Sequence, residues 1–169
     1  LRGISNLSKD RLFDELKKFK KSKVLESLSN DQYSIELIEI IFPQLKKIKI
    51  FKNLNSFAKN KLDECDIIFL LSLLIIDESD NLEFFIYKFN ISKKDQKRIL
   101  FLNEYLKNKN NKNNKNFNIK NLWKILYFNG KESLLDLINF HIFKSKKVDK
   151  KLLNFIDFFK DKKVPLLPL

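Results

Sequence analysis

The sequence predicts an all-α protein, a bundle-like array of about eight to ten short helices. The first observation is the stretch of residues 67–76 (IIFLLSLLII), which carries no charge and lies between Asp66 and Asp77. It is shorter than the roughly 20 apolar residues of a membrane-spanning helix, and a helix that is apolar on every face has to be surrounded by other elements. The second observation is the scarcity of turn residues, two Gly and three Pro, which disfavours a sheet with many tight hairpins. We therefore expect a central helix wrapped by amphipathic ones, and no membrane span.

The first predicted helix begins after Ser8, a favourable N-cap residue. Arg11 and Glu15 stand four residues apart and are expected to form an ion pair that fixes this helix. Its apolar stripe is expected to contain Leu12, Leu16 and Phe19. Its other faces carry several lysines, among them Lys17, Lys18 and Lys21.

Further short helices are expected before the central one. A helix over residues 33–42 should stop at Pro43, which cannot continue it. From there a helical period is expected to run toward Ala58, carried by Leu45, Ile48, Phe51 and Leu54. Aspartates spaced three apart border the central helix and are expected to mark helix ends: Asp63 with Asp66, and Asp77 with Asp80.

The helix that begins after Ser92 is the best local candidate for a phosphate contact. Ser92 with Asp95 resembles a capping box. Basic residues at the start of a helix oppose its dipole unless an anion lies between them, and the free N–H groups there already favour an anion. The basic residues in question are Lys93, Lys94, Lys97 and Arg98. The alternative is that these side chains simply face solvent.

The chain is expected to divide at residues 107–117. Residues 107–116 are only Lys and Asn, so this segment cannot bury apolar surface and is predicted to be a flexible loop. It separates the helices of residues 1–106 from a helical subregion of residues 118–169. The two parts form either one array or two subdomains.

Several expectations concern the last part of the chain. Asn118 or Asn121 should cap a helix that ends at Gly130. Trp123 and Tyr127 are four apart and form either an aromatic platform for a base or, more commonly, part of the core. The final helix is expected over residues 149–160. His141 is expected to be packed or at the surface rather than catalytic.

The composition points to a polyanionic partner and excludes several kinds of site. The formal net charge is +13, from 34 basic and 21 acidic residues, but only three of the basic residues are Arg. A basic surface favours nucleic acid, whereas dispersed lysines also serve solubility. One Cys excludes an internal disulfide framework and suits a reducing, cytoplasmic compartment. One His, His141, with one Cys excludes a structural zinc site and disfavours a His-centred triad.

Five segments occur in an order that resembles the class II tRNA nucleotidyltransferases and poly(A) polymerases, including bacterial CCA-adding enzymes. They are residues 7–17 (LSKDRLFDELK), 42–45 (FPQL), 90–94 (NISKK), 126–136 (LYFNGKESLLD) and 164–169 (VPLLPL). The resemblance implies the end of the neck and the body of such an enzyme, with a truncated tail and without the catalytic head. In that family the head holds metal ions on an Asp-x-Asp pair and selects nucleotides with Glu-Asp-x-x-Arg. Neither motif occurs here.

The resemblance therefore implies a transferase fragment that is inactive alone. Magnesium and ATP or CTP are implied only for the missing head, and this piece itself is expected to need no cofactor. Its implied partners are that head and the tRNA acceptor and TΨC arms, which a basic helical surface would hold by their phosphates. The residues expected to contact RNA are Lys17, Lys18, Lys21, Lys94, Lys97, Arg98 and Lys124. Those expected to support the fold are Arg11, Glu15, Pro43, Tyr127 and Gly130.

Two other functions remain open on the sequence. One is a helical protein-interaction scaffold without a nucleic-acid role, in which the charge serves solubility. The other is a basic DNA-binding domain, although three scattered arginines do not make a recognition helix. The face that would pack on the missing head is expected to be an exposed apolar patch. We therefore expect the fragment to associate with itself as its concentration rises.

Overall fold

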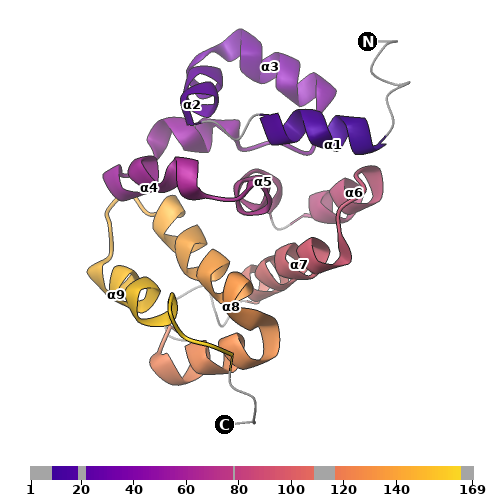
Figure 1. Ribbon diagram of the computed structural model, residues 1–169. Coiled ribbons are helices and arrows are strands. Elements are labelled where there is room, and N and C mark those ends of the chain that lie inside the picture. The colour runs from indigo at the N-terminus through magenta and orange to yellow at the C-terminus, as the bar shows by residue number, and fades with distance from the viewer. Residues whose placement is uncertain (1–8, 19–21, 78, 109–116, 165–169) are drawn as a thin grey trace.

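The computed structural model describes residues 9–18, 22–77, 79–108 and 117–164, and over these residues the protein is all-α, as predicted (Figure 1). No strand occurs in these ranges. The helices are α1 (Lys9–Lys18), α2 (Ser22–Asn30), α3 (Gln32–Ile41), η1 (Ile48–Asn53), α4 (Ser56–Lys61), η2 (Leu62–Glu64), α5 (Ile67–Ile75), α6 (Asn81–Lys88), α7 (Lys93–Lys107), α8 (Ile119–Lys144) and α9 (Lys150–Phe159); η1 and η2 are 3₁₀-helices.

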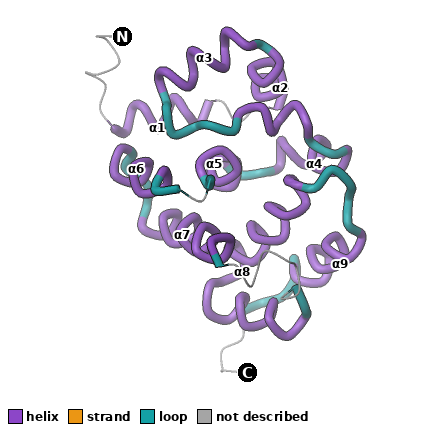
Figure 2. Tube along the Cα trace, turned by 180° about the vertical axis from the view of Figure 1, so that it is seen from behind, coloured by secondary structure: helices purple, strands orange, loops and turns teal. Residues whose placement is uncertain are grey.

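The predicted core helix is α5, at the centre of the molecule. Asp66 caps it by accepting a hydrogen bond from the N–H of Phe69 at 3.0 Å, and every residue from Ile68 to Ile75 is buried. Figure 1 shows α5 end-on, with α1, α2 and α3 above it and α7, α8 and α9 below it; Figure 2 shows the same arrangement from behind. Along the described residues, no helix is both long and apolar enough to cross a membrane.

The segment after α3 differs from the expected continuous helix. Residue Phe42 ends α3 just before Pro43, as predicted. The apolar residues that follow recur every three positions, which is the period of a 3₁₀-helix rather than of an α-helix. The chain accordingly forms turns and the 3₁₀-helix η1 there, and α4 begins only after Asn55.

Asn55 connects this segment to the other half of the chain. Its side-chain oxygen caps α4 by accepting from the N–H of Ala58 at 2.9 Å. Its side-chain nitrogen donates to the carbonyls of Ile142 and Ser145 at 2.7 and 2.9 Å. One buried side chain thus satisfies the start of α4 and the end of α8 together.

A single buried cluster extends across the predicted division of the chain. It includes residues from Phe13 to Phe159, and Phe69 of α5 packs edge-on against Phe143 of α8 at 5.0 Å between ring centroids. Residues 109–116 of the predicted loop lie outside the described residues. Lys107 is the last residue of α7, and Phe117 is buried, 3% exposed. The helices on both sides of the loop therefore share one core.

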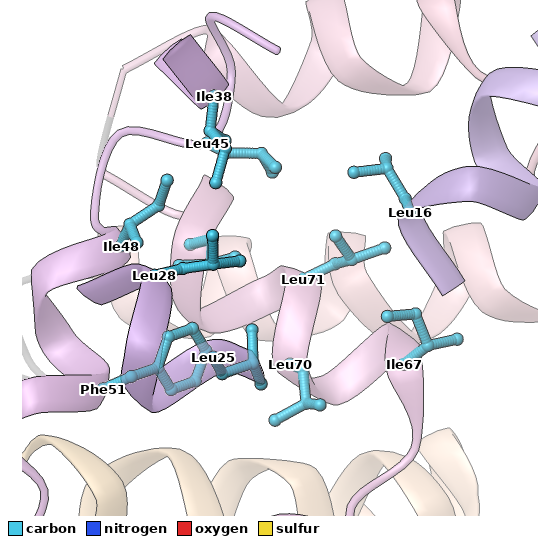
Figure 3. A pocket seen from close by; sticks show the side chains of 11 residues that line it. Leu16, Leu25, Leu28, Ile38, Leu45, Ile48, Phe51, Ile67, Leu70 and Leu71 are labelled. Atoms are coloured by element: carbon cyan, nitrogen blue, oxygen red, sulfur yellow. The ribbon is translucent and has the colours of Figure 1, made fainter. Parts of the chain in front are cut away.

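A small apolar cavity lies where the first helices meet α5 (Figure 3). Its volume is about 30 Å³. Only Leu, Ile and Phe side chains line it: Leu16, Leu25, Leu28, Ile38, Leu45, Ile48, Phe51, Ile67, Leu70, Leu71 and Leu74. An apolar cavity of this size offers no polar partner to a ligand, so we regard it as a gap in the packing of the core.

The last long helix is interrupted at Gly130. Asn118, rather than Asn121, caps α8 by accepting from the N–H of Asn121 at 3.0 Å. Gly130 has φ 83° and ψ 168°, a conformation that is essentially restricted to glycine. The residue thus ends a first helical segment, as predicted, and directs the second segment toward α4 and α5 (Figure 1).

Candidate nucleic-acid interface

An open hollow lies where the start of α7 faces the interruption of α8. Its lining residues are Lys94, Lys97, Asn129, Gly130, Lys131 and Glu132. Ser92 positions the start of α7 by capping it, accepting from the N–H of Asp95 at 3.2 Å. Gly130 brings the other wall to this point because no other residue readily adopts its backbone conformation. The structure therefore brings the predicted Lys94 and Lys97 together with Lys131, which the sequence did not single out.

The hollow carries an excess of positive charge. Lys94 Nζ pairs with Glu132 Oε1 at 2.8 Å, and Lys131 Nζ donates to the carbonyl of Lys160 at 2.6 Å. Three ammonium groups therefore stand against one carboxylate. The N-terminal ends of α7 and of the second segment of α8 add partial positive charge here, and the C-terminal end of the first segment of α8 adds partial negative charge. This combination suits an anion such as a phosphate group.

A basic strip with an exposed aromatic ring leads along α8 to the hollow. Lys120, Lys124 and Phe128 are spaced four apart, so they share one face of the helix, and all three are exposed. Phe128 is 68% exposed, two residues before Gly130. The sequence offered one signal for Phe128: it lies outside the inward-facing positions of this helix.

Trp123 does not belong to this strip. Its ring packs edge-on against Phe158 and Phe159 of α9, at 6.1 and 5.3 Å between centroids. Of the two interpretations of Trp123, core packing is the one that the structure supports. Tyr127 is half-buried and contacts the ring of Phe128 at 4.9 Å, so it supports the exposed ring.

The predicted contacts on α1 lie away from the hollow. Lys17 pairs with Asp14 at 2.8 Å and Lys18 with Glu15 at 2.6 Å. Helix α1 lies above α5, whereas α7 and α8 lie below it (Figures 1 and 2). Lys21 lies outside the described residues, and the ion pair of Arg11 with Glu15 stays a prediction.

Arg98 is a correction to the expected set of RNA contacts. It is 9% exposed, and its guanidinium donates to Asp136 from Nε and Nη2 at 2.9 and 3.0 Å and to Asp66 from Nη2 at 2.8 Å. Asp95 lies 3.7 Å from Nη1. A buried side chain held by carboxylates connects α5, α7 and α8, so we assign Arg98 to the fold. It falls one residue before Ile99 and four before Leu102 on the buried face of α7, a pattern that already indicated burial.

The carboxylates around Arg98 differ in pKa because they differ in burial. Burial raises the pKa of Asp136 to about 7, although the facing Arg98 acts against that rise. For Asp66, burial also acts to raise the pKa, but hydrogen bonds from Arg98 and from the N–H of Phe69 outweigh it and lower the pKa. Burial acts to lower the pKa of Arg98, but the two carboxylates outweigh it and raise the pKa, so this side chain stays charged.

His141 is packed, as expected. Its ring meets Phe117 edge-on at 4.7 Å between centroids, and its buried Nε2 has no hydrogen-bond partner within the described residues. Burial, with Lys144 nearby, lowers the pKa of His141 to about 4. The side chain is therefore neutral at physiological pH.

We found no metal site in the described residues and no similar protein that would indicate a further site. The described parts of the chain contain no group of three or more His, Cys, Asp or Glu side chains arranged to hold a metal ion. No protein-family model, no curated protein and no solved structure matches this chain.

Proposed function

We propose that this protein binds RNA through the hollow at Gly130 and the basic strip of α8. The observation that carries the proposal is the convergence of Lys94, Lys97 and Lys131 from two helices on one open hollow. Phosphate groups would lie among these ammonium groups, which release counterions from the RNA on binding. Arg98 takes no part, because its guanidinium is already held by carboxylates.

The arrangement fits an RNA in which a duplex passes into a single strand. Lysines on a helix contact the backbone of duplex RNA without reading bases, because the deep major groove hides the base edges. An exposed ring such as that of Phe128 offers a stacking surface to an unpaired base. The tRNA acceptor arm has both parts, since its duplex continues into the unpaired 3′ end.

The more specific proposal follows from the order of the sequence motifs. We propose that the chain is the RNA-binding part of a tRNA nucleotidyltransferase or poly(A) polymerase and holds the tRNA acceptor arm. A separate head, absent from this sequence, would supply Asp-x-Asp carboxylates, magnesium and ATP or CTP. The order of residues 7–17, 42–45, 90–94 and 126–136 supports this proposal.

The first test compares binding of tRNA that lacks its CCA end with binding of duplex DNA of equal length. The variant K94Q/K97Q/K131Q should bind tRNA at least tenfold more weakly. The plot of log affinity against log salt concentration should also become less steep. Each lost phosphate contact reduces the steepness by roughly 0.7–0.9, so three lost contacts reduce it by about two to three. The matched control is K17Q/K18Q, which removes two paired lysines on the other side of α5 and should leave affinity unchanged. Equal loss in both variants, or equal affinity for DNA, would contradict the proposal.

The second test concerns the exposed ring. Phe128→Ala should weaken binding to tRNA with an unpaired 3′ end by about 1–3 kcal/mol, or roughly five- to a hundredfold, because one base loses its stacking partner. Affinity for a blunt acceptor-stem duplex should hardly change. Fluorescence anisotropy with the two labelled RNAs measures both values. A similar loss for both RNAs would show that Phe128 does not stack on an unpaired base.

A further inference from the structure

Helix α3 has two apolar faces on opposite sides. Ile35 and Ile38 are buried in the core. Tyr33, Leu37 and Ile40 are 74%, 44% and 59% exposed. At about 100° per residue these three side chains fall within about 60° of one another, on the side away from the core. We call Tyr33, Leu37 and Ile40 the outer stripe. A helix with a second apolar face is normally covered by another element.

The outer stripe lies in one of two long segments without Lys or Arg; the other is residues 62–87. Residues 24–45 contain no Lys or Arg and four acidic residues, although the chain as a whole carries +13. Two of the four, Glu36 and Glu39, are exposed and lie on one side of α3, between the outer stripe and the buried Ile35. Gln32 donates to Glu36 at 2.9 Å and so fixes one of these carboxylates. This side of the stripe is therefore acidic, although the chain as a whole has a positive net charge.

This surface is separate from the proposed RNA site. Helix α3 lies at the top of Figure 1, above α5, and α7 and α8 lie below α5; Figure 2 agrees. The acidic side of α3 repels phosphate groups. RNA is thus not the chemical match for α3, and both surfaces can be occupied at once.

We propose that the outer stripe binds a cationic amphipathic helix of a partner protein. Apolar side chains of that helix would cover Tyr33, Leu37 and Ile40, in the way that helices bind through residues spaced three and four apart. Lys or Arg on its flank would face Glu36 and Glu39. A second copy in antiparallel orientation fits less well, because it would bring the acidic sides of the two α3 helices together.

The test uses the full chain and a labelled synthetic helix with Leu on one face and Lys on the other. This peptide should bind despite the positive charge of the protein. The variants L37S/I40S and E36K/E39K should each weaken its binding at least tenfold, the first by removing apolar area and the second by reversing the charge. The matched control Phe84→Ser removes an apolar side chain that is 66% exposed on α6 and should change nothing. Circular dichroism should show folded proteins, because every changed side chain is exposed.

Three results would overturn the proposal. The first is peptide affinity that L37S/I40S leaves unchanged. The second is concentration-dependent association of the chain alone that L37S/I40S abolishes in sedimentation, because the stripe would then bind a second copy. The third is a loss of tRNA affinity in L37S/I40S, because the stripe would then serve RNA. Unchanged tRNA affinity in this variant would support two separate surfaces.

Discussion

At the scale of single residues, Arg98 has the strongest effect that we expect on folding. It is one cation among three aspartates from three elements, and Asp136 is almost as buried as Arg98 itself. Removing Arg98 leaves the buried carboxyl of Asp136 without its partner, so this group must either carry an unpaired charge or take up a proton.

Arg98→Met should therefore lower the free energy of unfolding by about 3–5 kcal/mol. Urea denaturation followed by circular dichroism measures the change. The double variant R98M/D136L should recover most of the loss, because apolar groups of similar size can replace a buried pair. Asp66 is half exposed at its side chain, 51%, and can return to water. A double variant as unstable as Arg98→Met would show that the charge on Asp136 is not the cause.

His141 should make stability depend on pH. Its pKa is about 4 in the folded protein and 6.5 when exposed, so between these values the unfolded chain binds the additional proton. Stability from this group is therefore complete above pH 6.5 and is lost as the pH falls toward 4. Asp136, with its pKa raised to about 7, acts in the opposite direction over the same range.

His141→Gln isolates the histidine, because Asp136 titrates in both proteins. We compare how much the free energy of unfolding changes from pH 7 to pH 4.5 in each protein. Protonation of His141 should make the loss about 2 kcal/mol larger in the original protein than in the variant, since each pKa unit corresponds to about 1.4 kcal/mol. Urea titrations at the two pH values measure the difference. Identical pH dependence would mean that His141 is protonated as easily in the folded as in the unfolded protein.

At the scale of elements, the ends of helices could be predicted from the sequence better than their contacts. Ser92, Gly130 and the helix stop at Pro43 were recognised because caps and breaks depend on neighbouring residues. The position of Arg98 on the buried face of α7 was visible in the sequence, but its partners Asp66 and Asp136 lie at the start of α5 and within α8, which are distant in the sequence. The hollow is a similar case, since Lys131 joins Lys94 only once Gly130 has redirected α8.

Gly130→Ala should destabilise the protein by about 1–3 kcal/mol, the cost of holding a residue with a Cβ in this backbone region. Apart from the neighbouring residues of its own helix, no atom lies within 4 Å of the position of an added Cβ, so the backbone conformation causes the loss. Thermal or urea unfolding measures it, and Asn129→Ala is the helical control, expected within about 0.5 kcal/mol. The variant should also bind tRNA more weakly, because the wall of the hollow shifts. A neutral Gly130→Ala would mean that α8 can straighten.

Asn55 offers a test of one side chain that serves two helices. Asn55→Asp keeps the acceptor that caps α4 but loses the donor to the carbonyls of Ile142 and Ser145. It also places a negative charge at the negative end of α8. We expect a loss of about 2–3 kcal/mol, as for Asn55→Ala. Asn118→Asp, at an exposed cap, should change stability by less than about 0.5 kcal/mol. Equal effects of the two Asp variants would show that the contact with α8 contributes little.

At the scale of the whole molecule, the buried cluster crosses the predicted boundary at residues 107–117. The sequence left one array and two subdomains open, because a polar loop says nothing about whether the helices on each side pack together. The shared core favours one cooperative unit. The all-α class itself followed directly from composition and from the apolar residues 67–76, since these features need no knowledge of distant contacts.

Unfolding should therefore occur as one transition. Trp123 is the single tryptophan and reports on the packing of α8 against α9, whereas circular dichroism reports on all helices. The two signals should give the same midpoint in urea to within experimental error. An earlier change in Trp123 fluorescence would show that the part after residue 117 unfolds by itself.

The absence of Lys and Arg from residues 24–45 also gives this protein an unusual pattern of digestion. Trypsin cleaves after Lys and Arg, so complete digestion cuts most of the chain into short pieces but releases residues 62–88 as one peptide of 27 residues and residues 24–46 as one peptide of 23 residues. That peptide contains all of α3, including both its buried and its exposed apolar side chains. Oxidative footprinting of the native protein before digestion, followed by fragmentation of this one peptide in the mass spectrometer, would therefore report how far Tyr33, Leu37 and Ile40 are covered. Ile35 and Ile38 in the same peptide would serve as the buried reference.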